Sequence, residues 1–196
     1  MAVNDIKPKE VYQHANSFLD TFRLSKIPVQ VSFTPGFSTH GKRSDYIINN
    51  FSFSILGGKT GGVSGVEIAG LFNLSIHYVR VVQVAGLFSL TKSFVEGVQV
   101  AGIHNNVTGS IKGLQVCGID NIVKGAFKGV QVGGIYNHVN DNVQGLQVGA
   151  ITNYTKKKIN GIQLAGIANV SNEVNGVQVG GIFNMQRSFV ACRLVL

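Results

Sequence analysis

Three consecutive repeats in the middle of the chain carry the residue types that could do chemistry. His104, Asp120 and Tyr136 lie 16 residues apart and occupy the same position in successive units. If the units stack, these side chains come within hydrogen-bonding distance, and a histidine beside a carboxylate can serve as a base or a metal ligand. A catalytic site would also need a nucleophile or a third ligand, and none occurs at matching spacing. We therefore interpret this column as structural, a weak candidate site, and expect no catalytic residue, metal or cofactor.

The element that must position these side chains is a repeat. Residues 65–190 are eight copies of a unit of roughly 16 residues, from GVEIAGLFN at position 65 and GVQVAGIHN at position 97 to GVQVGGIFN at position 176. A fixed period over this many copies is typical of stacked structural units. The function of the chain should therefore reside in the stack rather than in one local motif.

Several positions of the unit are restricted to one residue type. The second, fourth, seventh and fifteenth positions are apolar, and the sixth is glycine in all repeats but one. The third position is Glu67 in the first repeat and glutamine in the others: Gln83, Gln99, Gln115, Gln131, Gln147, Gln163 and Gln178. The ninth position is Ser89 in the second repeat and asparagine in the others: Asn73, Asn105, Asn121, Asn137, Asn153, Asn169 and Asn184. We expect the amides to form hydrogen-bonded ladders and the apolar columns to form the core.

Two all-β folds fit this period. In a β-solenoid each unit of about 16 residues forms one coil, so that identical residues stack about 4.8 Å apart. In the alternative, an antiparallel outer-membrane β-barrel, each repeat forms one strand and the alternating apolar positions face lipid. Neighbouring antiparallel strands run in opposite directions, so a column of identical asparagines would not meet itself. We therefore favour a solenoid of eight coils.

Three segments are expected along the chain. Residues 1–28 contain an amphipathic helix, about residues 9–24, whose apolar stripe would cap one end of the stack. Residues 29–64 contain two strands that lead into the repeats. Residues 65–196 form the repeat domain. The tail after the last repeat is too short for a second cap, so we expect either end-to-end self-association or a further segment in the natural protein.

Composition and charge exclude several classes of function. The net charge is +8, but the basic residues are scattered and the only run is Lys156, Lys157 and Lys158. A nucleic-acid groove needs a continuous basic stripe with exposed aromatic residues, so no nucleic-acid partner is expected. The histidines outside the eighth position, His138 among them, are interpreted as isolated surface residues. No stretch has the pattern of a signal peptide or the length of a membrane helix.

The acidic residues argue against a carbohydrate-cleaving enzyme. Such an enzyme would need carboxylates clustered on one face of the stack. The repeats spread theirs over five units: Glu67, Glu96, Asp120, Asp141 and Glu173. We therefore rank a polysaccharide-active β-helix enzyme last and expect that the protein is not an enzyme.

The order of these segments resembles a family. The block VQVSFTPGFSTHG, followed by NNFSFSILGGKTGGVSGVEIAGLFN and serial GVQVAGIxN units, resembles the surface-repeat proteins of Gram-negative cell envelopes, especially those attached to TonB-associated and carboxypeptidase-regulatory-like modules. The resemblance covers about residues 28–190. It implies a location in the cell envelope, at the outer membrane or cell surface, rather than an activity. The chain departs from the family in lacking an export signal and an aromatic-terminated final strand, which suggests a partial chain.

These observations lead to one expected function. The chain should be a non-enzymatic structural or adhesive repeat domain of the bacterial cell surface or outer membrane. Its candidate partners are a glycan or a protein at the surface, the membrane itself, and further copies of the chain joined end to end.

Overall fold

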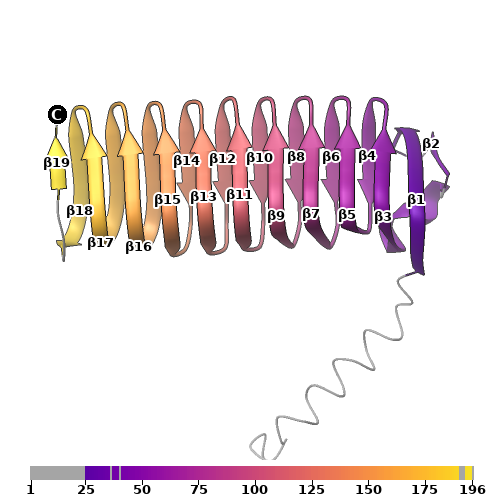
Figure 1. Ribbon diagram of the computed structural model, residues 1–196, viewed down its shortest axis with the longest axis horizontal. Helices are drawn as coiled ribbons and strands as arrows, with labels where there is room; N and C mark the ends of the chain where they lie inside the picture. Colours follow the sequence, from indigo (N-terminus) through magenta and orange to yellow (C-terminus); the bar gives the residue numbers. More distant parts are fainter. Residues whose placement is uncertain (1–24, 36, 40, 190–192, 196) are drawn as a thin grey trace, which may run out of the picture.

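The computed structural model describes residues 25–35, 37–39, 41–189 and 193–195, which form an all-β solenoid of about nine turns (Figure 1). The one helical element in this part of the chain is a short 3-10 helix, η1 (Gly41–Tyr46). Within the same residues, no helix has the length and apolar character needed to cross a membrane. The predicted capping helix, residues 9–24, lies outside the described residues.

Each coil contains a long strand and a short strand. The long strands are β1 (Ser25–Thr34), β3 (Ile47–Ser54), β5 (Gly62–Ala69), β7 (Tyr78–Ala85), β9 (Phe94–Ala101), β11 (Ile111–Cys117), β13 (Phe127–Gly133) and β15 (Val143–Gly149). The short strands are β4 (Gly57–Thr60), β6 (Phe72–Ser75), β8 (Phe88–Thr91), β10 (His104–Val107), β12 (Asp120–Val123) and β14 (Tyr136–Val139). Toward the C-terminus the two merge in β16 (Thr152–Ala165) and β17 (Ala168–Gly180), which are followed by β18 (Phe183–Phe189) and β19 (Arg193–Val195). A two-residue strand, β2 (Phe37–Ser38), lies beside β1.

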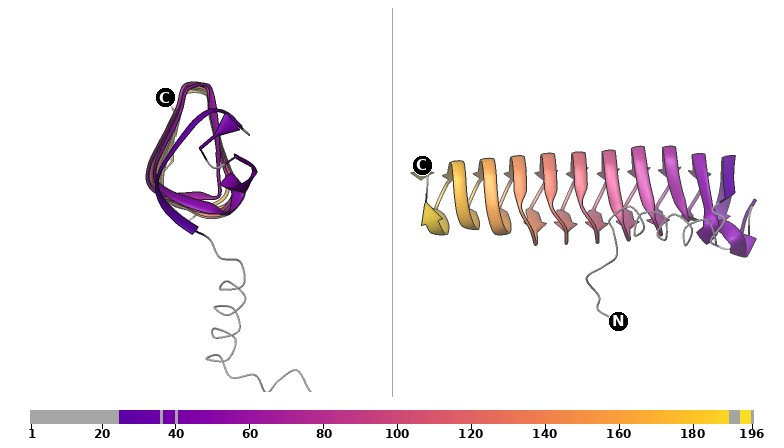
Figure 2. Two further views of the ribbon diagram at one scale, coloured as in Figure 1. Left: turned by 90° about the vertical axis from the view of Figure 1, so that its right-hand side faces the viewer. Right: turned by 90° about the horizontal axis from the view of Figure 1, so that it is seen from below.

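The coils stack in parallel and in register. Gln115 pairs with Gln131 and Asn121 pairs with Asn137, so each residue type of the repeat meets itself in the next coil. Seen along the axis, the coils superimpose in a rounded triangular outline (Figure 2). The solenoid prediction is confirmed, and the antiparallel alternative is wrong because successive repeats pair with the same strand direction.

The interior of the coils differs from the predicted core. The third, fifth, ninth, eleventh and fifteenth positions face inward, whereas the second, fourth and seventh face outward. Gln131 is fully buried, for example, while its neighbour Val130 is 37% exposed. The apolar core consists of the fifteenth column with three valines of the eleventh: Val79, Val95, Ile111, Phe127, Val143, Ile159, Val174, Val107, Val123 and Val139. Assigning the second, fourth and seventh columns to the core was therefore wrong.

The inward face is the one that can fill a narrow coil without leaving polar groups unpaired. Successive side chains of a strand point to opposite faces, so the alternating pattern allows either face to be turned inward. The inward face carries a small residue, such as Ala101 or Cys117, at the fifth position. These small residues leave room for a glutamine side chain to extend inside the coil, where its amide meets the amide of the next coil.

The glycine at the first position is required by the backbone. From Gly97 to Gly176 this position has φ between 132° and 146°. A Cβ atom on Gly113 would collide with the carbonyl oxygen of Gly97 in the preceding coil. Val81 stands at this position in the second repeat and has φ of 85°, the one positive value at a non-glycine residue of the described chain. A β-branched residue in this region of φ is strained.

We expect the substitution Val81→Gly to raise the free energy of unfolding by about 1 kcal/mol. A strained φ costs about 1–3 kcal/mol, and the greater unfolded-state entropy of glycine offsets part of the gain. Urea denaturation followed by circular dichroism would measure the change. The opposite change in a regular coil, Gly113→Val, should lower the midpoint. A Val81→Gly protein that unfolds at lower urea than the parent would show that the bend tolerates a side chain.

Candidate functional site

A ladder of glutamine side chains runs through the interior. The Nε2 group of each glutamine donates to Oε1 of the glutamine in the preceding coil, as from Gln131 to Gln115 and from Gln115 to Gln99, both at 2.8 Å. The bonds continue without interruption from Gln178 to Gln83 and are 2.6 to 2.8 Å long. All seven side chains are fully buried. The predicted glutamine ladder is present.

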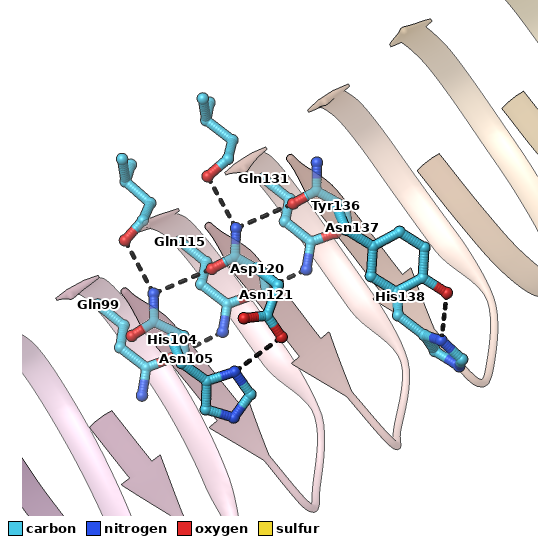
Figure 3. A network of polar contacts seen from close by, with 12 residues as sticks. Gln99, His104, Asn105, Gln115, Asp120, Asn121, Gln131, Tyr136, Asn137 and His138 are labelled. Atoms are coloured by element: carbon cyan, nitrogen blue, oxygen red, sulfur yellow. Dashed lines mark hydrogen bonds and ion pairs between the residues drawn. The ribbon is translucent and has the colours of Figure 1, made fainter. Parts of the chain in front are cut away.

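A second ladder, of asparagines, runs in the opposite direction. The Nδ2 group of Asn121 donates to Oδ1 of Asn137 in the following coil at 2.9 Å, and also to the backbone carbonyl of Val132 at 2.7 Å. The same pattern extends from Asn105 to Asn184. Figure 3 shows both ladders side by side over three coils. Each asparagine from Asn105 to Asn169 therefore bonds the next coil twice.

The asparagine ladder is interrupted at Ser89. This residue replaces asparagine in the second repeat, and its hydroxyl is too short to reach the neighbouring amides. Oγ of Ser89 and Oδ1 of Asn105, which faces Ser89, are buried and have no partner in the described structure. Oδ1 of Asn73 is also buried without a partner, because Gly58 stands opposite it in the preceding coil. The sequence showed the exception, but not that it leaves acceptors unpaired.

The glutamine ladder ends on a carboxylate. Glu67 is fully buried and accepts hydrogen bonds from Gln83 at 2.6 Å, from Ser75 at 2.9 Å and from Thr60 at 3.3 Å. Burial raises the pKa of its carboxyl group, and the three donors oppose that effect. Ser52, which pairs with Glu67 in the preceding coil, has a buried hydroxyl with no partner in the described structure. Glu67 was noticed in the sequence as a variant of the glutamine column, without a role of its own.

The candidate cluster on the outer surface is only partly assembled. His104 Nδ1 lies 2.8 Å from Asp120 Oδ2. Tyr136 does not join this pair, because its hydroxyl bonds to Nδ1 of His138 at 2.7 Å (Figure 3). Nε2 of His138 in turn donates to Oδ1 of Asn140 at 2.6 Å. Nδ1 is therefore the nitrogen that accepts the hydrogen bond from the tyrosine hydroxyl.

His138 is therefore not an isolated surface residue, as the sequence had led us to expect. The ring of Tyr154 lies against it, with the ring centroids 4.8 Å apart. His138 and Tyr154 share the tenth position of successive repeats, and His138 stands two residues after Tyr136 on the same strand, so it faces the same side. That spacing was the available signal.

In the described part of the chain these groups are joined to one another by hydrogen bonds. No three His, Cys, Asp or Glu residues in the described part of the chain lie close enough to hold a metal ion. The buried thiol of Cys117 has its pKa raised to about 11 by burial, so it is protonated at neutral pH. Partial burial also raises the pKa of the Tyr136 hydroxyl, which disfavours its ionised form.

The fold and the two amide columns define a parallel β-solenoid whose interior is bonded by side-chain amides. No protein-family model matches the sequence, and no curated protein or solved structure is significantly similar to it.

Removing one rung from either ladder should destabilise the fold. We expect Gln131→Leu and Asn121→Leu each to lower the free energy of unfolding by about 2–5 kcal/mol. Each substitution leaves buried donors or acceptors in both neighbouring coils without a partner. Asn172→Leu is the control, since Asn172 is exposed and should change stability by less than about 0.5 kcal/mol. Chemical denaturation measures all three. Equal effects at buried and exposed positions would show that the ladders contribute nothing specific.

Completing the asparagine ladder should have the opposite effect. Ser89→Asn would supply a donor to Oδ1 of Asn105 and an acceptor for Asn73, and we expect a gain of about 1–2 kcal/mol. Thermal unfolding would detect it as a higher Tm. Ser89→Ala, which adds no amide, should show no such rise, and a rise of the same size would point to packing instead.

The buried carboxyl group should make stability depend on pH. Because the pKa of Glu67 is raised in the folded protein, its contribution is greatest below the ordinary value of 4.5 and is lost as pH rises through the folded value. We expect Glu67→Gln to remove the loss of stability that the wild-type protein shows as pH rises above 4.5. Near neutral pH the variant should have a free energy of unfolding about 1–3 kcal/mol higher than the wild type. Unfolding midpoints measured from pH 4 to pH 8 compare the two proteins. The exposed Glu96, changed to glutamine, should leave the wild-type profile in place.

Proposed function

We propose that this chain is a non-enzymatic structural and binding rod of the bacterial cell surface or outer membrane. The observation that carries the proposal is the hydrogen bonding of the polar side chains to one another. The ladder amides bond one another inside the coils. On the outer surface, His104 bonds Asp120 and Tyr136 bonds His138. These polar groups, the Tyr136 hydroxyl beside His138 included, serve in hydrogen bonds that join neighbouring residues and coils.

The stack is suited to a mechanical or display role. About nine turns at a spacing of about 4.8 Å give a rod roughly 43 Å long. Every coil is tied to the next by backbone pairing and by side-chain amides, so the rod resists bending at any one point. The positions that vary between repeats lie on the outside, where a partner can contact them.

The location is supported by the resemblance of residues 28–190 to envelope surface repeats. It rests on the order of the segments and on the repeated GVQVAGIxN unit. An epitope inserted after Asp141, in an outer turn, would test it in a Gram-negative host that carries the natural gene. Antibody labelling of intact cells is the expected result, and labelling only after permeabilisation would contradict the proposal.

A hollow on the outer surface of the rod favours a glycan as the binding partner. The hollow has a volume of about 410 Å³ and is lined in part by Ser110, Lys128, Asn142, Lys158 and Asn160. Ammonium and amide groups match the carboxylates and hydroxyls of an acidic polysaccharide. Lys128 has no ion-pair partner among the described residues. A bound acidic glycan would thus supply a counter-charge that the rod itself does not.

We expect Lys128→Ala with Asn142→Ala to weaken binding of polygalacturonate at least about tenfold in titration calorimetry, which corresponds to 1.4 kcal/mol. His104→Ala and Asp120→Ala should each leave that affinity within about twofold, because their side chains bond each other away from the hollow. Loss of a ligand or metal in these two variants, with folding retained, would contradict a structural role for the pair. Lys92→Ala, exposed and outside the hollow, is the matched charge control.

End-to-end association is a second candidate for the rod. Strands β18 and β19 pair with β17 on one side, and no described strand pairs with their other side. Unpaired backbone groups along such an edge can accept a strand from another chain. Growth by such a contact would be open-ended, so if it forms, sedimentation would show species that lengthen with concentration.

A further inference from the structure

The outward side chains of the long strands form a continuous apolar surface, which we call the aliphatic face. It consists of the second and fourth positions of all eight repeats, each of which is valine, isoleucine or leucine. These side chains are partly to well exposed, with Ile68 and Ile162 at 42% and Val130 at 37%. At the N-terminal end, β1 and β3 extend the surface with residues such as Val31 at 46% and Phe53 at 51%.

The aliphatic face is larger than a soluble monomer normally leaves open to water. The apolar seventh column borders it along one corner, as Ile135 does at 42% exposure. Ten strands spaced about 4.8 Å apart, with about 17 Å from the second to the seventh position, cover on the order of 800 Å². The largest apolar patch on a typical monomer is about 300–600 Å². A surface of this size therefore indicates a partner.

We infer that a second copy of this chain covers the aliphatic face, in a two-fold dimer with the two faces packed together. The inference goes beyond the proposed function, which stands whether or not the rod is paired. A buried area of about 800 Å² on each partner is the size of a standard stable interface. Two β-sheets packed face to face at about 10 Å use the same aliphatic interdigitation as a protein core.

The repeat itself selects another copy. Outward side chains recur with the spacing of the coils, about 4.8 Å, along the whole face. Ridges and grooves of that spacing mesh along their full length only with a surface of the same period. A second solenoid provides such a surface, whereas an irregular globular partner would match over a few coils at most.

The charges around the face agree with a two-fold axis parallel to the solenoid axis. One edge of the face is bordered by the sixteenth position, where Lys112 and Lys128 add positive charge beside the paired Arg80 and Glu96. The strand beyond the opposite edge carries a single acidic residue, Asp120, which is paired with His104. A two-fold axis parallel to the solenoid axis places the lysine edge of each copy beside the opposite, nearly neutral edge of the other, so the two lysine edges stay apart. A two-fold axis parallel to the strands would instead place the lysine edges of the two copies side by side. Repulsion between like charges disfavours that arrangement.

The same charges disfavour a lipid surface as the occupant. A helix or sheet that lies on an anionic membrane normally carries basic residues around its apolar face and aromatic anchors at the interface. Here only one edge is basic, the other carries Asp120, and the chain has no tryptophan. Membrane binding is therefore an outcome that the experiment must distinguish.

The test is sedimentation of the whole chain at concentrations from about 1 to about 100 μM. We expect a particle of twice the monomer mass that does not grow further, because a two-fold contact is closed whereas end-to-end contacts are not. The double variant Val130→Lys with Ile162→Lys places two charges on the aliphatic face and should weaken the dimer at least about 100-fold. Thr108→Lys with Asn172→Lys adds the same charge at exposed positions off the face and should leave the dimer intact.

Circular dichroism and urea unfolding of both double variants establish that they remain folded. A monomer at every concentration, open-ended growth, or a dimer that survives Val130→Lys with Ile162→Lys would each overturn the inference. Flotation with vesicles of phosphatidylcholine and phosphatidylglycerol separates the lipid alternative. Binding to these vesicles that is lost in the face variant but kept in its control would assign the face to a membrane. None of these results bears on antibody labelling of intact cells, so failure of the dimer and failure of the proposed location remain distinguishable.

Discussion

The buried hydrogen bond between side-chain amides of successive coils is the interaction on which this structure depends. A buried amide without a partner costs about 1–3 kcal/mol, so each glutamine must find its counterpart one coil away. That requirement fixes the coil length and the register along the whole stack. In a solvent-free interior such chains of bonds also strengthen one another. The one interruption, at Ser89, leaves Oδ1 of Asn105 in the following coil without a donor and shows how little variation the ladder admits.

The opposite directions of the two ladders have an electrostatic consequence. Glutamine amides donate toward the N-terminal end and asparagine amides toward the C-terminal end, so the dipoles of the two columns oppose each other along the axis. A single column of aligned dipoles would accumulate partial charge at its ends, as a helix does. Glu67, an acceptor without an amide N–H, is a natural end point for the glutamine bonds, and the Oε1 atom of Gln178 marks the other end, with no partner in the described structure.

Filling the interior with amides turns most of the branched aliphatic residues outward. The solenoid is therefore polar and hydrogen-bonded inside, and apolar along one broad side. This inversion concerns function directly, because the reactive side chains are tied into the fold while the surfaces remain regular and available. The structure thus offers extended faces and a shallow hollow to a partner.

The sequence by itself determined the period and the two amide columns. It favoured a parallel stack over an antiparallel barrel, because identical residues at a fixed spacing can bond one another only where they meet in successive coils. It did not determine which face of the strands turns inward. Alternation is symmetric, and hydrophobicity alone favoured the side that the structure exposes, as at Val130. Nor did it show that Tyr136 turns to His138 instead of Asp120, since column spacing brings all these groups near one another. Only the tertiary structure decided these points, because they depend on how much space a coil encloses and on which hydrogen bonds close within it.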